Sequence, residues 1–141
     1  SNRMKKVIFF CLVFIFFSCD KVKQYDKVIL GSWSIQTVML KDKNDFTFYD
    51  FAPQGLFEFK SNRLASGSVS ASFPGLYGTF YDSFAVNGNY YLDLEKQEFN
   101  LVNGNDTLHS RLFLLTKSDL EFEFYDSIQG KRVRYSFKKS K

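Results

Sequence analysis

Hydrophobic and polar residues alternate with a period of two along most of the chain after residue 31. In residues 120–125, leucine and phenylalanine alternate with glutamate, and in residues 132–138, valine, tyrosine and phenylalanine alternate with arginine, serine and lysine. Successive side chains of a strand point to opposite faces, so this alternation predicts half-buried β-strands. No stretch after the N-terminal segment has the 3.6-residue period of an amphipathic helix. The pattern therefore predicts an all-β domain.

Turn-forming residues separate the alternating stretches. Asn-Gly pairs, the strongest hairpin signals, occur at 87–88 and 103–104, and other turn signals occur at 41–44, 61–62 and 129–130. A meander of eight to ten strands removes its free edges by closing on itself. We therefore predict an antiparallel up-and-down barrel over residues 31–141. The expected strands lie near 32–41, 45–52, 56–60, 63–71, 77–86, 90–95, 98–103, 107–116, 119–126 and 131–138.

The N-terminal segment has the features of an export signal. Residues 1–3 precede Met4 and resemble the remnant of a tag, and Met4-Lys5-Lys6 forms a short basic stretch. Residues 7–17 are an unbroken apolar run of 11 residues. A membrane-spanning helix needs about 20 such residues, whereas the apolar region of a signal peptide has about 7–15. We expect residues 1–18 to be a signal peptide.

Cys19 follows this run directly. The sequence Phe16-Phe17-Ser18-Cys19 resembles the lipobox of bacterial lipoproteins. The resemblance implies cleavage before Cys19 and covalent attachment of lipid to that residue, including acylation of its amine. Two or more acyl chains anchor a protein stably. Residues 19–30 are then expected to form a lipidated tether, with no other cofactor, and the membrane to be the outer membrane of a bacterial envelope.

The charge of the chain depends on this signal. The formal net charge is +4, and it falls to +1 when Arg3, Lys5 and Lys6 are removed. A nucleic-acid partner is therefore not expected. Surface-exported lipoproteins of the Bacteroidota often carry an acidic run after the cysteine, which residues 20–23 lack, so the periplasmic side is expected rather than the cell surface.

The start of the first strand carries a second resemblance. Gly31-Ser32-Trp33 at the opening of an antiparallel meander is similar to the first strand of the lipocalins. Many small lipoproteins of the Bacteroidota resemble the whole layout of lipobox, spacer, Gly-x-Trp strand and hairpins. The resemblance implies that Trp33 plugs the base of a lipocalin-like barrel and that an arginine of a late strand covers it. Arg132 or Arg134 fits this position. We take Gly31, Trp33 and Arg134 as the residues that mark the resemblance.

Two segments are richer in aromatic residues than a plain barrel wall requires. In residues 45–51, phenylalanines occupy one face of the expected strand, while a tyrosine and a phenylalanine occupy the other; residues 73–84 are similar. The second apolar face either packs beneath a loop or the spacer, or forms an exposed contact surface for a protein or a glycan. The candidate contact residues are Phe46, Phe48, Tyr49, Phe51, Tyr77, Phe80 and Tyr81.

The sequence contains no motif of known catalytic chemistry. It has no nucleophile elbow, phosphate-binding loop, paired-cysteine motif or His-x-x-x-His spacing, and its one histidine, His109, is expected on an outer face. Four carboxylates, Asp93, Glu95, Glu121 and Glu123, lie on faces expected to be wet. We expect neither an enzyme nor a metal site.

Three functions remain to be compared. The first is a non-enzymatic binding or accessory module for another envelope protein or complex. The alternative is a carrier of a small apolar ligand, because an eight-stranded barrel either fills with side chains or holds one small ligand. The third is an enzyme that uses the carboxylates, which a pocket with two acids of perturbed pKa would support.

Overall fold

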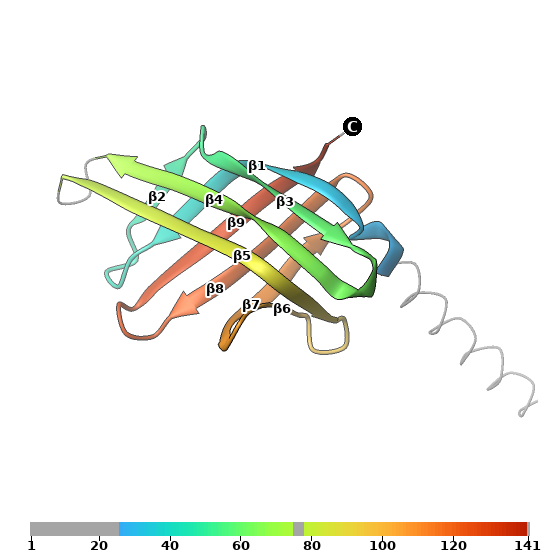
Figure 1. Cartoon of the computed structure of the whole chain (residues 1–141). Coiled ribbons are helices and arrows are strands. Elements are labelled where there is room, and N and C mark those ends of the chain that lie inside the picture. Colours follow the sequence, from blue (N-terminus) through green and yellow to red (C-terminus); the bar gives the residue numbers. More distant parts are fainter. Residues whose placement is uncertain (1–25, 75–77, 141) are drawn as a thin grey trace, which may run out of the picture.

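The computed structural model describes residues 26–74 and 78–140, which form a β-barrel after a helical turn at residues 26–28 (Figure 1). Cys19, the signal segment and Tyr77 lie outside the described residues. The elements are β1 Gly31–Lys41, β2 Thr47–Asp50, β3 Gln54–Lys60, η1 Ser61–Arg63, β4 Leu64–Pro74, β5 Thr79–Asp93, β6 Glu98–Asn103, β7 Asp106–Leu115, β8 Asp119–Asp126 and β9 Lys131–Lys139.

Antiparallel pairing of β1 with β9 closes the barrel. Eight strands form the wall, and β2 is an additional strand. It pairs with the end of β1, where Leu40 lies opposite Phe48, whereas β3 pairs with the beginning of β1, where Trp33 lies opposite Phe57. The all-β, up-and-down barrel predicted from alternation and turns is confirmed.

Aromatic rings fill the interior of the barrel. Their centroids lie 4.8 Å apart for Phe84 and Tyr135 and 5.1 Å apart for Phe99 and Phe122, both in edge-to-face geometry. Such contacts add to the free energy that burial of the rings already contributes. The interior is thus a packed core. The rings in this network are Phe57, Phe59, Phe84, Tyr90, Phe99, Phe122, Phe124, Tyr135 and Phe137.

Trp33 is fully buried at the end of the barrel next to the helical turn. Its indole Nε1–H donates to the carbonyl of Ile29 at 2.8 Å, and Ile29 itself has no exposed surface. The ammonium of Lys139 donates to the carbonyl of Val28 at 2.8 Å. Residues 26–30, expected to belong to the tether, are therefore part of the folded domain, because Ile29 completes the core beneath Trp33.

The cation over Trp33 is Lys139, and the expectation for Arg134 is wrong. The Nζ of Lys139 lies 5.2 Å from the indole ring. Arg134 lies on the outer face instead, with its Nε 3.0 Å from Glu123 and its guanidinium 3.9 Å from the ring of Phe113. The reason is strand parity, since positions 133, 135, 137 and 139 of β9 face inward and the arginines between them face outward.

The hairpin expected at Asn87-Gly88-Asn89 is also absent, and these residues lie inside the long strand β5. A Cβ at Gly88 would lie 2.0 Å from the carbonyl oxygen of Val102 on β6. The glycine therefore permits close approach of two strands, which is a second use of glycine in a sheet. The other Asn-Gly pair does precede a tight hairpin, in which Asn103 pairs with Asp106 and Gly104 has a φ of +64°.

Within the described part of the chain, no helix is long and apolar enough to cross a membrane.

Candidate functional site

The predicted contact residues separate into inward and outward groups. Phe48 and Phe80 are half-buried and pack against the core, so they belong to the barrel interior. Tyr49, Phe51 and Tyr81 are exposed by 50%, 76% and 73%. This split follows the alternation along β2 and β5, because neighbours in a strand face opposite sides of the wall. The remaining described candidate, Phe46, is exposed in the β1–β2 loop.

A carboxylate joins the end of β2, which lies between Tyr49 and Phe51, to β4. Asp50, at the end of β2, accepts hydrogen bonds from the backbone N–H of Ala52 at 2.9 Å and of Ser72 on β4 at 2.9 Å. Ser72 lies opposite Tyr81 in the β4–β5 pair. The Asp50–Ser72 bond thus links Tyr81 to the neighbourhood of the rings on either side of Asp50.

The rings of Tyr49 and Phe51 stack against each other, with centroids 5.4 Å apart and planes inclined by 12°. Each ring limits the rotamers of the other, which lowers the entropy that a partner would have to remove. We call Tyr49, Phe51 and Tyr81 the aromatic face. Aromatic residues such as tyrosine and phenylalanine are enriched at protein interfaces.

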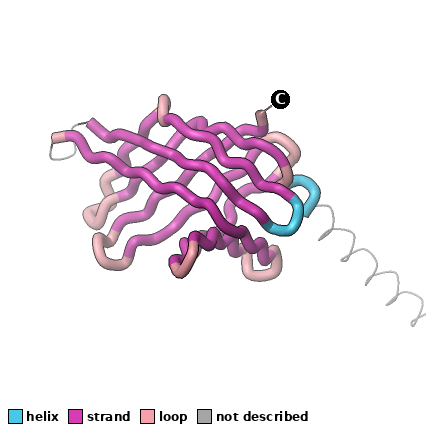
Figure 2. Tube along the Cα trace, viewed as in Figure 1, coloured by secondary structure: helices cyan, strands magenta, loops and turns pink. Residues whose placement is uncertain are grey.

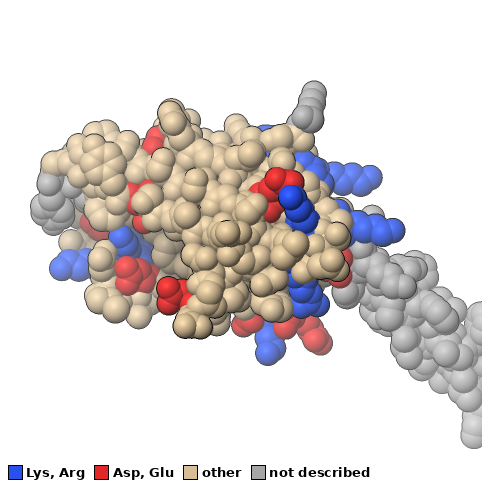
Figure 3. Space-filling model, in the orientation of Figure 1, with Lys and Arg blue, Asp and Glu red and all other residues tan. Residues whose placement is uncertain are grey.

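The wall beside the aromatic face carries little charge. Outward positions on β4 between residues 66 and 72 are all serine, and those opposite them on β5 include Ser83 and Ala85. Figure 3 shows that most of this side of the molecule is uncharged, with lysine, arginine and carboxylates grouped mainly toward its margins. A partner that meets this wall desolvates hydroxyls and rings rather than ions.

The aromatic face lies in the half of the barrel farther from residue 26. The helical turn packs beside Trp33 at the beginning of β1, whereas β2 pairs with residues 38–41 at the end of β1. Figure 2 shows this turn at one end of the barrel and the long β4–β5 hairpin extending to the other. The N-terminal end and the aromatic face are therefore separated by most of the length of the barrel.

Clefts occur at both ends of the barrel. One, of about 420 Å³, lies beside the helical turn and contains Arg63 and Tyr90. Burial, and next the carboxylate of Asp26, raise the pKa of Tyr90, while Arg63 opposes them. The other, of about 200 Å³, lies at the opposite mouth, where the ammonium of Lys131 lies 4.1 Å from the ring of Phe80. The first cleft reaches the core ring of Tyr90, and the second reaches Phe80, which packs against the core.

Asp82 is an interior carboxylate that the sequence analysis did not identify. It accepts a hydrogen bond from the hydroxyl of Tyr135, which is buried. Burial raises the pKa of Tyr135 far above its ordinary value, and the charge of Asp82 acts in the same direction. The signal available in the sequence was its even position between the inward residues Phe80 and Phe84.

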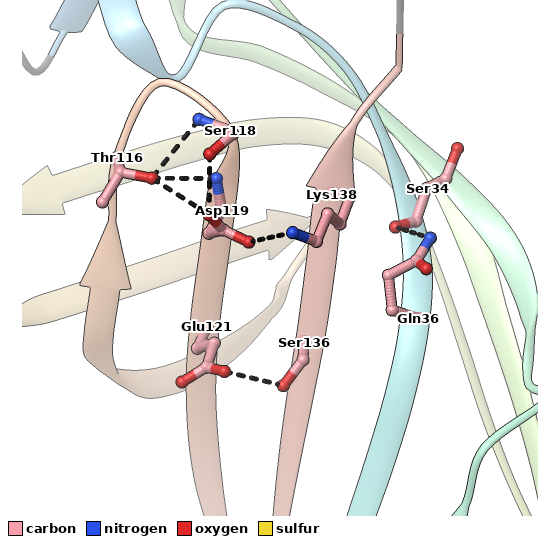
Figure 4. Close-up of polar contacts among 8 residues, drawn as sticks. All are labelled: Ser34, Gln36, Thr116, Ser118, Asp119, Glu121, Ser136 and Lys138. Atoms are coloured by element: carbon pink, nitrogen blue, oxygen red, sulfur yellow. Dashed lines mark hydrogen bonds and ion pairs between the residues drawn. The ribbon is translucent and has the colours of Figure 1, made fainter.

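A polar cluster at the β7–β8 turn is structural. The hydroxyl of Ser118 lies 2.7 Å and the ammonium of Lys138 3.1 Å from Asp119, and together they lower the pKa of this carboxyl (Figure 4). Thr116 accepts the backbone N–H of Asp119 at 3.0 Å. These bonds close the turn and join it to β9, so the cluster explains the turn without a ligand.

The candidate carboxylates are engaged in similar local bonds. Asp93 accepts the N–H of Lys96 in the β5–β6 turn at 3.1 Å, Glu121 accepts the hydroxyl of Ser136 at 3.1 Å, and Glu123 pairs with Arg134. Glu95 is exposed, as is His109 on its outer face. Across residues 26–74 and 78–140, no group of three or more histidine, cysteine, aspartate or glutamate side chains is placed to hold a metal ion.

No protein-family model matches the chain, and no curated protein matches it. Eight chains of solved structures match, among them a redesigned beta barrel that is 14% identical. That match covers 82% of this chain and 94% of the designed one, with a TM-score of 0.36.

Proposed function

We propose that this protein is a membrane-anchored envelope lipoprotein that serves as a non-enzymatic binding or accessory module for another envelope protein or complex. The observation that carries the proposal is the aromatic face, which exposes three large rings on a barrel whose interior is already filled. These three rings point away from the core, so they are not needed to fill it. Exposure of apolar rings to water costs free energy, which a partner that covers them would recover.

The wall around the aromatic face supports a protein as the partner. Rigid rings supply contact area at a low cost in conformational entropy, and truncation of such anchors often costs 2 kcal/mol or more of binding free energy, roughly a thirtyfold loss of affinity. The Asp50–Ser72 bond holds the backbone beneath the rings in place before any partner arrives. Preorganisation of this kind favours binding.

The proposed anchor agrees with the position of the face. Residues 20–25 separate Cys19 from the first described residue and span at most about 20 Å when extended. With lipid on Cys19, the end of the barrel that contains Trp33 would lie next to the outer membrane, on its periplasmic side. The aromatic face would then point away from the bilayer, toward a partner in the periplasm.

The alternative function, carriage of a small apolar ligand in the barrel interior, has less support. Aromatic rings in mutual contact occupy the space that such a ligand would need. The two end clefts are open to solvent and partly lined by charged residues, among them Asp26, Arg63 and Lys131. They do not offer the apolar enclosure of a typical carrier.

The test is recovery of a partner from native membranes. The full chain would be isolated gently and its stable complexes weighed by native mass spectrometry. Replacement of Tyr49, Phe51 and Tyr81 by alanine should reduce partner recovery at least tenfold, because it removes all three rings. Tyr125→Ala, which removes a ring exposed by 60% on β8, is the matched control and should recover the partner normally. Equal recovery with the triple variant would refute the assignment.

A further inference from the structure

The first ten of the fifteen residues of β5 have a strand neighbour on one side only. β4 pairs with β5 from Thr79 to Asn89, whereas β6 pairs only with the stretch from Asn89 to Asp93. Figure 1 shows the part of β5 nearest the β4–β5 loop with β4 beside it and no strand on its other side. Residues 79–88 therefore form a free strand edge. Such an edge presents backbone N–H and C=O groups that can pair with another strand.

A hydrogen bond on β4 establishes which backbone groups of β5 point toward the free edge. The N–H of Ser72 bonds to Asp50, away from β5, so Ser72 and Tyr81 form a pair without mutual backbone bonds. The backbone N–H and C=O of Tyr81 therefore point to the free edge. Because alternate residues of a strand point the same way, those of Thr79 and Ser83 do so too.

The side chain of Asn103 confirms this direction, because it bonds to the outward groups of Ala85 and Asn87 at the end of the edge nearest β6. Its amide nitrogen donates to the carbonyl of Ala85 at 3.3 Å, and its amide oxygen accepts the N–H of Asn87 at 3.4 Å. Between the β4–β5 loop and Ala85, the outward N–H and C=O groups of Thr79, Tyr81 and Ser83 bond to no residue within the described ranges. The open stretch is thus centred on Tyr81.

We propose that this edge pairs with the same edge of a second copy of the chain, antiparallel and about a two-fold axis at Tyr81. In this register, Tyr81 lies opposite Tyr81 of the second copy, and Thr79 lies opposite Ser83. All three N–H groups and all three C=O groups of each edge then have partners. A two-fold interface of this kind is self-complementary and closes at two copies.

The near absence of charge on the edge favours pairing with a second copy, and the position of Asp82 selects the register. Between Thr79 and Gly88 the one charged residue is Asp82, which faces inward and accepts the hydroxyl of Tyr135. Two such edges meet without repulsion between outward side chains. A register centred on Asp82 would place two like charges opposite each other, which is unfavourable, whereas the register centred on Tyr81 places Phe80 opposite Asp82.

Edge pairing has a consequence for the aromatic face. Strands that join edge to edge continue one sheet, so the outer walls of the two copies face the same side. The Tyr81 rings would meet at the axis, and two aromatic faces would become one surface. The dimer is inferred from the strand edge alone, and it does not depend on the proposed function.

The first test is sedimentation of the full chain in density-matched detergent over a range of concentrations. We expect a monomer–dimer equilibrium, with a dissociation constant at least tenfold higher in Ser83→Pro. Proline removes an edge N–H but no bond to β4, because this N–H points outward. Ser83→Ala keeps the N–H and should dimerise like the wild type. Near-ultraviolet circular dichroism, to which Trp33 contributes, and the Tm establish that both variants fold.

Amide hydrogen exchange gives a second measurement on the unaltered chain. Exchange at Thr79, Tyr81 and Ser83 should slow as protein concentration rises, while exchange at the exposed turn residue Asn105 should not change. A wild-type monomer at every concentration, or equal dimerisation of Ser83→Pro, would overturn the inference. Ser83→Pro retains all three rings, so loss of the dimer and loss of the proposed partner are separable.

Discussion

Tyr135 shows how one residue can serve both packing and polarity in this barrel. Its ring lies 4.8 Å from that of Phe84 and 5.8 Å from that of Phe124, and its hydroxyl bonds to Asp82. The alternation along β9 predicted that Tyr135 faces inward. It did not predict the bond to Asp82, because the two residues are 53 positions apart in the sequence and meet only across the closed barrel.

This contact predicts a loss of stability in alkaline solution. The raised pKa keeps Tyr135 protonated in the folded state, whereas in the unfolded chain it ionises near pH 10. The unfolded state then binds fewer protons, so the free energy of unfolding falls as pH rises above about 10, by up to about 1.4 kcal/mol per pH unit for this group. Urea unfolding at successive pH values measures the slope.

Tyr135→Phe should make that slope smaller. Some slope should remain, because the pKa of Tyr90 is also raised. Tyr125→Phe is the matched control, since Tyr125 is exposed and its replacement should leave the slope unchanged. If the alkaline slope of Tyr135→Phe equals that of the wild type, protonated Tyr135 does not contribute as described.

At the scale of elements, the strands themselves were predictable and their partners were less so. The ranges 98–103 and 119–126 agree with β6 and β8 because alternation and the flanking turns are local signals. The sequence indicated a hairpin at Asn87-Gly88-Asn89, but Gly88 lies against Val102 within one long strand. Close approach to a neighbouring strand and a tight turn both require glycine, so a single sequence does not separate them.

The attachment of β2 depends on one side chain and gives a second prediction. Asp50→Ala removes the acceptor for the N–H groups of Ala52 and Ser72. We expect the free energy of unfolding to fall by about 1–3 kcal/mol, with faster amide exchange at Ser72 than in the rest of β4. Chemical denaturation and hydrogen exchange measure the two effects.

Asp106→Ala is the control for this variant, because Asp106 is exposed and its side chain forms no hydrogen bond to any described residue. It should change the free energy of unfolding by no more than about 0.5 kcal/mol. Unchanged exchange at Ser72 in Asp50→Ala would mean that β2 and β4 are held together in another way.

At the scale of the whole molecule, the closed barrel followed from many consistent local signals, but the candidate site followed only in part. The aromatic segments marked the correct region, and strand parity then decided that Tyr49 and Tyr81 face outward while Phe48 and Phe80 face inward. The free edge of β5 had no local signature, since it arises because the short strand β6 pairs only with residues 89–93 of β5.

The two ends of the barrel differ in the residues that they carry. Trp33 and the helical turn lie at one end of the barrel, and the aromatic face lies in the other half. We infer that the first end faces the membrane and the second faces a partner. We therefore expect the rings of the aromatic face to touch that partner in the cell.

Site-specific photo-crosslinking in the native envelope would detect this contact. A photoreactive amino acid in place of Phe51 on the aromatic face should crosslink to a second protein at a defined mass. The same amino acid in place of Tyr91, which is exposed by 45% and lies next to Arg63 at the end of the barrel that contains the helical turn, should not. Crosslinking from Tyr91 alone, or from neither position, would mean that the aromatic face does not touch the partner.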